Sequence, residues 1–98
     1  MRVALCQLAV TKDPKTNLER ARAAVAEAAA GGARLAVLPE ATLVRFGRDA
    51  LAAAEPLDGP FVSGLAEAAR EHGVAVLAGV FEPSADGRVH NTAVAIEA

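Results

Sequence analysis

Residues 35–40, with the sequence Leu-Ala-Val-Leu-Pro-Glu, constrain the fold of this chain more than any other stretch. Four consecutive apolar residues predict a short strand of a parallel sheet that is covered on both faces. Pro39 ends the strand because proline has no N–H group to donate to a neighbouring strand. Glu40 then follows at the carboxyl end of the strand, where open α/β sheets bind ligands and place catalytic groups.

The segments around this strand alternate between strand and helix patterns. Residues 3–10 are mostly apolar and predict a first strand. Residues 14–30 predict a helix that begins after the N-cap Asp13 and ends at Gly31-Gly32. The resulting β-α-β unit is expected to have a right-handed crossover. Residues 41–56 lack a clear period and predict a loop that roofs a pocket, with a short helical turn over residues 49–55.

The second half of the chain predicts one helix and two strands. The helix begins near Asp58 and ends at Gly73, and the strands span residues 74–81 and 89–96, joined by a turn that contains Asp86-Gly87. The predicted order is β-α-β-loop-α-β-β, an α/β fold with a mixed sheet and one domain over residues 1–98. Four side chains of the two helices are expected to pack against the sheet: Leu18, Val25, Phe61 and Leu65.

Charge and composition exclude several classes of function. The net charge is −2 with 10 basic and 12 acidic residues interspersed, and the only aromatics are three Phe, so no nucleic-acid surface is expected. No apolar run reaches membrane length. The single cysteine, Cys6, excludes an internal disulfide and a cysteine-based metal cluster, and suits a reducing cytoplasm. No cofactor fingerprint and no metal-ligand spacing occur, so neither group is assigned.

Few individual residues have the chemistry of a site. Cys6 lies within the predicted first strand and is interpreted as a small buried thiol. His72 is expected to complement the dipole at a helix C-terminus, and Asn91 to bond backbone near the turn. Taken alone, Glu40 is more often a solvated or salt-bridged loop acid than a catalytic one.

Together these stretches resemble the nitrilase superfamily, the carbon–nitrogen hydrolases. The matching segments, in order, are Val3–Gln7, Asn17–Arg20, Gly32–Glu40, Phe46-Gly47, Gly73–Val76 and Asn91–Ala93. The resemblance implies an α-β-β-α sandwich and a catalytic set of Glu, Lys and Cys, with a second supporting Glu. Glu40 corresponds to the first Glu, the general base for a cysteine thiol. The lysine steadies the oxyanion, and water hydrolyses the acyl thioester.

The resemblance further implies a small amide or nitrile substrate and a homo-oligomer for the full-length form. The catalytic Lys and Cys have no counterpart here, because Cys6 matches the first strand and the only lysines, Lys12 and Lys15, precede the first helix. We therefore expect the amino-terminal portion of an amidohydrolase, inactive as a 98-residue chain. An inert truncated module with a folding or pairing role is the alternative. A receiver-type regulatory domain fits poorly at residues 8–10 and 81–83.

Overall fold

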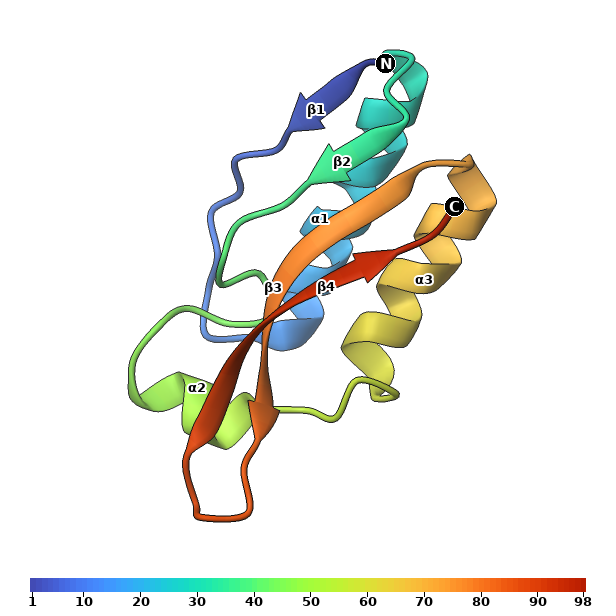
Figure 1. Cartoon of the computed structure of the whole chain (residues 1–98). Coiled ribbons are helices and arrows are strands. Elements are labelled where there is room, and N and C mark those ends of the chain that lie inside the picture. The colour runs from blue at the N-terminus through green and yellow to red at the C-terminus, as the bar shows by residue number, and fades with distance from the viewer.

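The computed structural model describes all 98 residues and has a four-stranded sheet with two long helices against one face (Figure 1). The strands are β1 (Val3–Leu5), β2 (Leu35–Val37), β3 (Ala75–Pro83) and β4 (Val89–Ile96), and the helices are α1 (Pro14–Ala30), α2 (Arg48–Ala53) and α3 (Pro60–His72). The sheet order is β1-β2-β3-β4. Strands β1, β2 and β3 are parallel, and β4 is antiparallel to β3. The predicted mixed α/β architecture is therefore confirmed.

Both long helices begin and end at the residues that the sequence indicates. The Asp13 carboxylate caps α1 by accepting hydrogen bonds from the backbone N–H of Lys15 at 3.2 Å and from the Thr16 hydroxyl at 2.7 Å. After α1, Gly32 takes the left-handed conformation with φ of 84°. Gly73, with φ of 65°, does the same after α3. Glycine suits both positions because a side chain is strained at such angles.

The core lies between the sheet and the pair α1 and α3. Val25, Phe61 and Leu65 are buried, as predicted. Leu18 is half-buried and packs at the edge of this core against α3. A Cβ at Gly64 would lie 2.7 Å from a Leu18 methyl carbon, so the glycine allows the two helices to approach closely. Burial of each large side chain contributes about 1.5–3 kcal/mol.

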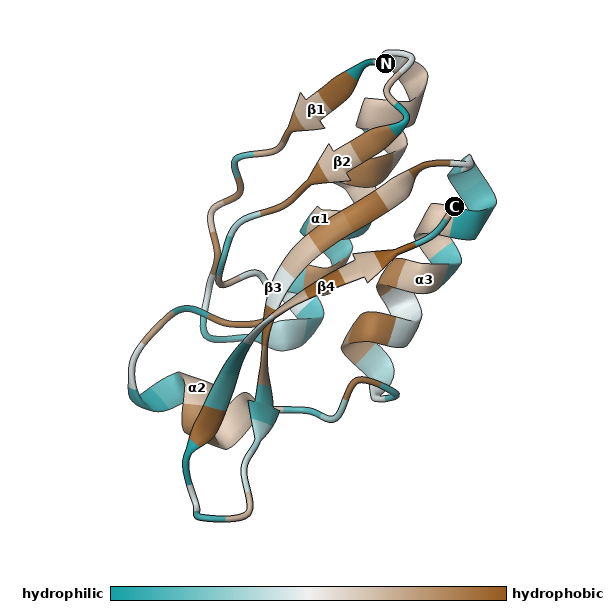
Figure 2. Ribbon diagram, viewed as in Figure 1, coloured by the Kyte–Doolittle hydropathy of each residue, from teal (hydrophilic) through white to brown (hydrophobic).

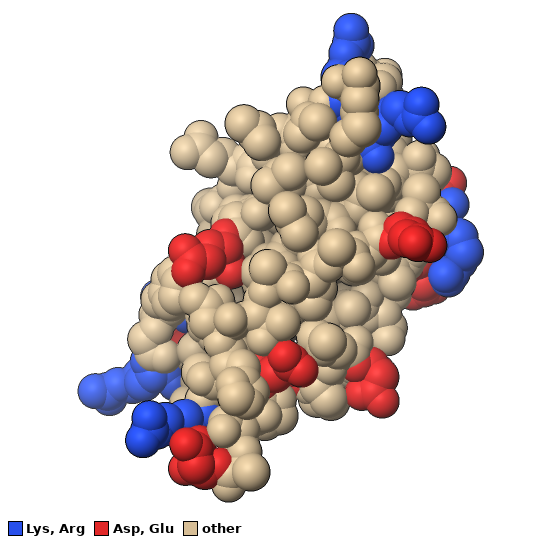
Figure 3. All heavy atoms as spheres, in the orientation of Figure 1, with Lys and Arg blue, Asp and Glu red and all other residues tan.

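The opposite face of the sheet carries apolar side chains without a covering layer. Val3, Leu5 and Leu77 on this face are 44%, 82% and 36% exposed. Figure 2 shows the hydrophobic colour along β1, β2 and much of β3, and Figure 3 shows that the charged groups of this view gather mainly toward its margins. The prediction that the strand at residues 35–38 is covered on both faces is wrong for this chain, because helices lie on one face alone and Leu35 and Val37 are half-buried.

The first strand is shorter than predicted. Strand β1 ends at Leu5, whereas the apolar pattern extends to Val10. The last bond to β2 runs from the backbone N–H of Cys6 to the Val37 carbonyl. Strand β2 itself ends at Val37, so residues 7–10 have no strand to pair with. A strand needs a partner along its length, and the partner sets the limit here.

The segment after Glu40 does not form the expected roof over a pocket. Its first four residues, Ala41 to Val44, are all buried. The buried Asn17 side chain of α1 donates to the Leu43 carbonyl at 3.0 Å and satisfies that backbone group. The free energy gained by burying Leu43 and Val44 therefore favours a buried loop over an exposed one. Helix α2 spans Arg48–Ala53, close to the helical turn predicted over residues 49–55.

Strands β3 and β4 form a hairpin, as predicted, and β3 continues two residues beyond Phe81. Gly87 in the turn has φ of 82°, and the Asp86 carboxylate accepts hydrogen bonds from the Ser84 hydroxyl and the Arg88 backbone N–H. The long hairpin brings the start of β4 beside the end of β3, close to the turn that carries Glu40. No helix of the structure combines the length and the apolar character that crossing a bilayer requires.

Candidate active site

Glu40 lies at the carboxyl end of β2, in a turn that begins after Pro39. It lines a hollow of about 350 Å³ together with residues from the carboxyl end of β2 and from the middle of β3 and β4. The other lining residues are Val37, Leu38, Pro39, Leu77, Ala78, Gly79, Asn91, Thr92 and Ala93. The Glu40 side chain is exposed, and it faces this hollow rather than a convex surface. The predicted position of Glu40 at a cleft is therefore confirmed.

Backbone hydrogen bonds hold the segment around Glu40 against Gly79 of β3. The Gly79 N–H donates to the Pro39 carbonyl at 3.1 Å, and the Gly79 carbonyl accepts from the Thr42 N–H at 2.8 Å. The buried Thr42 hydroxyl donates to the same Pro39 carbonyl at 2.6 Å. A Cβ at position 79 would lie 1.4 Å from the Glu40 carbonyl oxygen, so only glycine allows this approach.

The Glu40 carboxylate has one protein partner, the side-chain amide of Asn91 on β4. Asn91 Nδ2 donates to Glu40 Oε2 at 2.9 Å, although the two residues are 51 positions apart in the sequence. The prediction that Asn91 bonds backbone near the turn is wrong. Antiparallel pairing with β3 places Asn91 two residues from Ala93, the residue opposite Gly79, and so directs its side chain to the face that carries Glu40.

The Glu40 carboxylate has no cationic partner in the protein. No Lys, Arg or His nitrogen lies within 4.0 Å of it, since the ion pairs of this chain join other residues. Glu40 Oε1 accepts no hydrogen bond from the protein, because the Asn91 amide is bound to Oε2. A carboxylate of this kind can accept a proton on its free oxygen. No three His, Cys, Asp or Glu side chains come together in a group that could hold a metal ion.

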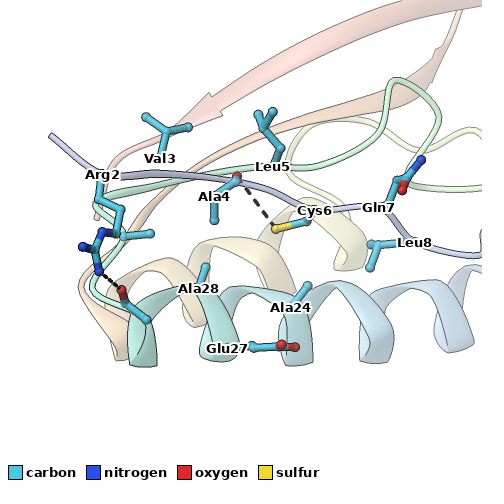
Figure 4. Close-up of a pocket in the computed structure, with 12 residues that line it drawn as sticks. Arg2, Val3, Ala4, Leu5, Cys6, Gln7, Leu8, Ala24, Glu27 and Ala28 are labelled. Atoms are coloured by element: carbon cyan, nitrogen blue, oxygen red, sulfur yellow. Dashed lines mark hydrogen bonds between the residues drawn. The ribbon is translucent and has the colours of Figure 1, made fainter.

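Cys6 lies in a different cavity, of about 410 Å³, between β1 and α1 (Figure 4). It is half-buried one residue beyond β1, so the prediction of a buried thiol within the strand is only partly met. Its Sγ points toward α1 and lies 3.9 Å from the Ala4 carbonyl oxygen. Burial raises the pKa of the Cys6 thiol, and the negative charge of Glu27 on α1 raises it further. A thiol held protonated in this way is a poor nucleophile.

The remaining candidates also lie away from the hollow. His72 is exposed in the last turn of α3, where it can complement the helix dipole as predicted. Lys12 and Lys15 are exposed near the start of α1, and His90 is exposed on β4. None of these four residues lines the hollow that contains Glu40.

The roles of Gly79 and Thr42 were not predicted from the sequence, and the partner predicted for Asn91 was wrong. A glycine inside a strand pattern is a known signal for close approach of another backbone, so Gly79 could have been singled out. Thr42 has no comparable local signal. Asn91 belongs to one of the segments that resemble the superfamily, but its contact with Glu40 depends on the register of β4.

Comparison with known proteins identifies the family to which this chain belongs. The sequence profile of the carbon–nitrogen hydrolase family matches residues 2–98. A hydrolase of Mycobacterium tuberculosis is 46% identical over 97% of this chain and 34% of its own length. The chloroplastic omega-amidase of Arabidopsis thaliana is 32% identical over 92% of this chain and 26% of its own length. The chain thus spans about a third or less of these curated relatives.

A solved structure supports the same assignment. The crystal structure of an amidase from Nesterenkonia superposes on this chain with a TM-score of 0.82 at 30% identity, and the match covers 99% of this chain and 38% of that one. The family profile extends over nearly the whole sequence, and the fold agrees with that of a solved relative. This chain belongs to the carbon–nitrogen hydrolase family, within the nitrilase superfamily.

Proposed function

We propose that these 98 residues are the base-carrying, amino-terminal part of an amidohydrolase that cleaves a non-peptide C–N bond of a small amide, with Glu40 as general base. One observation carries the proposal. Glu40 ends a central strand beside a hollow, its carboxylate is not neutralised by a cation, and one of its oxygens is free. The names of an omega-amidase and of the Nesterenkonia amidase favour an amide over a nitrile.

The proposed reaction uses a thioester. The free oxygen of Glu40 takes the proton of a cysteine thiol, and the thiolate forms a C–S bond with the amide carbon. A lysine ammonium stabilises the oxyanion that develops on the carbonyl oxygen. When the C–N bond breaks, the protonated Glu40 returns its proton to the leaving nitrogen. Glu40 then removes a proton from water, which hydrolyses the thioester to a carboxylic acid and restores the thiol.

The cysteine and lysine of this mechanism follow from the resemblance to the superfamily. Cys6 lies in the cavity between β1 and α1, and Lys12 and Lys15 do not line the hollow of Glu40. In the Nesterenkonia amidase, acrylamide has undergone Michael addition at an active-site cysteine in one solved mutant, which supports a cysteine nucleophile in a relative. We propose that both groups come from the part of the full-length relatives that this chain does not span.

The uncovered face of the sheet supports this division of the protein. Val3, Leu5 and Leu77 expose apolar surface on the face over which Glu40 crosses Gly79. Exposed apolar surface of this extent is typical of an interface. We propose that the second sheet of an α-β-β-α sandwich packs here and carries the missing catalytic groups to Glu40.

The test is a chimera in which residues 1–98 replace the matching third of the Mycobacterium tuberculosis hydrolase, assayed with a panel of small amides. We expect turnover by the chimera and none by the 98-residue chain alone. Glu40→Gln should lower kcat of the chimera by about 10²–10⁴-fold, which is the usual contribution of a general base.

Glu19→Gln is the matched control, because Glu19 is an exposed acid of α1 outside the hollow, and it should leave kcat unchanged. Full activity of the Glu40→Gln chimera would refute the assignment of the base. Turnover by the chain alone, lost on Cys6→Ser, would instead make Cys6 the nucleophile. A chimera that folds and remains inactive on every amide would favour the non-catalytic pairing module.

A further inference from the structure

We infer that Asn91 is a positioning residue for Glu40, an inference that rests on the proposed role of Glu40 as general base. Its side-chain amide selects which carboxylate oxygen of Glu40 is occupied and which remains free to take a proton. The contact joins the end of β2 to the start of β4 across the sheet. Asn91 itself has no titratable group, so its role is to orient Glu40 and not to transfer a proton.

The Glu40 backbone is already fixed by its contacts with β3. Gly79 bonds to the carbonyl of Pro39 and to the N–H of Thr42, the residues on either side of the Glu40-Ala41 pair. The Glu40 carbonyl rests directly on Gly79, at a place where a Cβ would collide with it. The remaining freedom of Glu40 therefore lies in its side-chain torsions, which have several staggered minima in an exposed residue.

The Asn91 side chain is the donor that restricts those torsions. Asn91 Nδ2 lies 2.9 Å from Glu40 Oε2, a normal distance for an N–H···O hydrogen bond. Asn91 lies in β4 opposite Phe81, and every residue of β4 pairs with a residue of β3. The backbone of Asn91 therefore cannot shift easily. Strand β3 thus holds the backbones of both Glu40 and Asn91. Their side-chain hydrogen bond connects two segments that are already fixed relative to each other.

The hydrogen bond between Asn91 and Glu40 is not needed to hold the fold together. Both side chains are exposed, so water competes for the bond and its contribution to folding stability is small. No other protein donor and no cation contacts the carboxylate. Loss of Asn91 should therefore change the orientation of Glu40 and leave the stability of the fold nearly intact. A loss of activity without a loss of stability would distinguish a positioning role from a merely structural one.

The first experiment examines the contact itself in the 98-residue chain by 1H–15N NMR. We expect the side-chain amide resonances of Asn91 to titrate with acid as the Glu40 carboxylate is protonated, and this titration to vanish in Glu40→Gln. Asn91 resonances that do not respond to pH would overturn the inference without touching the proposed function.

The second experiment measures kinetics in the chimera. Asn91→Ala should lower kcat by about 10- to 100-fold with little change in KM, because a misplaced catalytic group loses reactive geometry rather than substrate affinity. Asn91→Asp places a second negative charge beside Glu40, so it should move the acid limb of the pH–rate profile to higher pH. The melting temperature of both variants should stay close to that of the parent.

A double mutant and a control variant show whether the proposed function of Glu40 or only the positioning role of Asn91 is wrong. Asn91→Ala should have no further effect on kcat in the Glu40→Gln background, because two residues that act as a unit are not additive. His90→Ala, an exposed neighbour on the same strand, should leave kcat unchanged. Full activity of Glu40→Gln would refute the proposed function. Loss of activity in Glu40→Gln with parental kcat and pH profile in both Asn91 variants would refute the positioning role alone.

Discussion

Replacement of Gly79 by alanine is the sharpest test of how the turn that carries Glu40 is held. An alanine Cβ at position 79 would lie 1.4 Å from the Glu40 carbonyl oxygen, 2.2 Å from its carbonyl carbon and 2.7 Å from its Cα. These atoms are backbone, so no side-chain rotation can relieve the clash. A nonbonded contact needs at least 3.0 Å, so the two segments must separate by about 1.6 Å.

A separation of that size breaks the two hydrogen bonds that Gly79 makes to Pro39 and Thr42. Two backbone hydrogen bonds contribute about 1–3 kcal/mol together, and overpacking of a buried site costs about 1–3 kcal/mol more. We therefore expect Gly79→Ala to lower the free energy of unfolding by about 2–6 kcal/mol. Each kcal/mol lowers the melting temperature of a domain of this size by about 4–8 °C.

The assay is urea unfolding followed by far-UV circular dichroism, with Gly31→Ala as the matched control. Gly31 has φ of −81°, and a Cβ there would lie 3.6 Å from its nearest neighbours, so alanine should fit. The control should stay within about 1 kcal/mol of the parent. Free energies of unfolding for Gly79→Ala and the parent that agree within about 0.5 kcal/mol would refute the close approach of Glu40 to β3.

Two further predictions concern stability. Leu65→Ala should lower the free energy of unfolding by about 2–5 kcal/mol, because Leu65 is 0% exposed. The control Leu51→Ala, at a residue that is 58% exposed, should change the free energy of unfolding little. Equal effects of the two substitutions would place the Leu65 face of α3 in solvent. The Thr16 hydroxyl, and then backbone N–H groups, lower the pKa of Asp13 from its ordinary 3.8. Stability from this cap is therefore present above that pH and is lost as pH falls through the lower folded-state pKa. Thr16→Val should reduce this acid sensitivity in urea melts, and an unchanged pH dependence would contradict the assignment.

The boundaries that the sequence predicted well depend on single residues with local effects. Asp13 starts α1 because its carboxylate bonds the first turn, and Gly73 ends α3 because it tolerates a left-handed angle. Strand β2 ends at Val37, two residues before Pro39, which has no N–H group with which to extend the strand. Glu40 could therefore be placed at the end of a strand before any tertiary contact was known.

The features that the sequence did not predict depend on partners far along the chain. Strand β1 is short because β2 ends at Val37, and no residue within 3–10 encodes the length of its neighbour. The contact of Asn91 with Glu40 needs the register between β3 and β4 as well as the turn after β2. The loop after Glu40 is buried, and its Leu43 carbonyl is satisfied by Asn17 of α1, a contact that the spacing of apolar residues does not reveal.

The order of strands in the sheet has a consequence for the way this chain can fold during synthesis. Because the sheet order β1-β2-β3-β4 is also the chain order, each strand finds its partner already released from the ribosome. Chains emerge at about 5–20 residues per second, whereas hairpins form in about 1–10 μs. The β3–β4 hairpin can therefore form as soon as both of its strands have emerged. Glu40 gains its backbone clamp only when Gly79 has emerged, and its carboxylate acquires a fixed orientation only with Asn91, 51 residues after Glu40 itself.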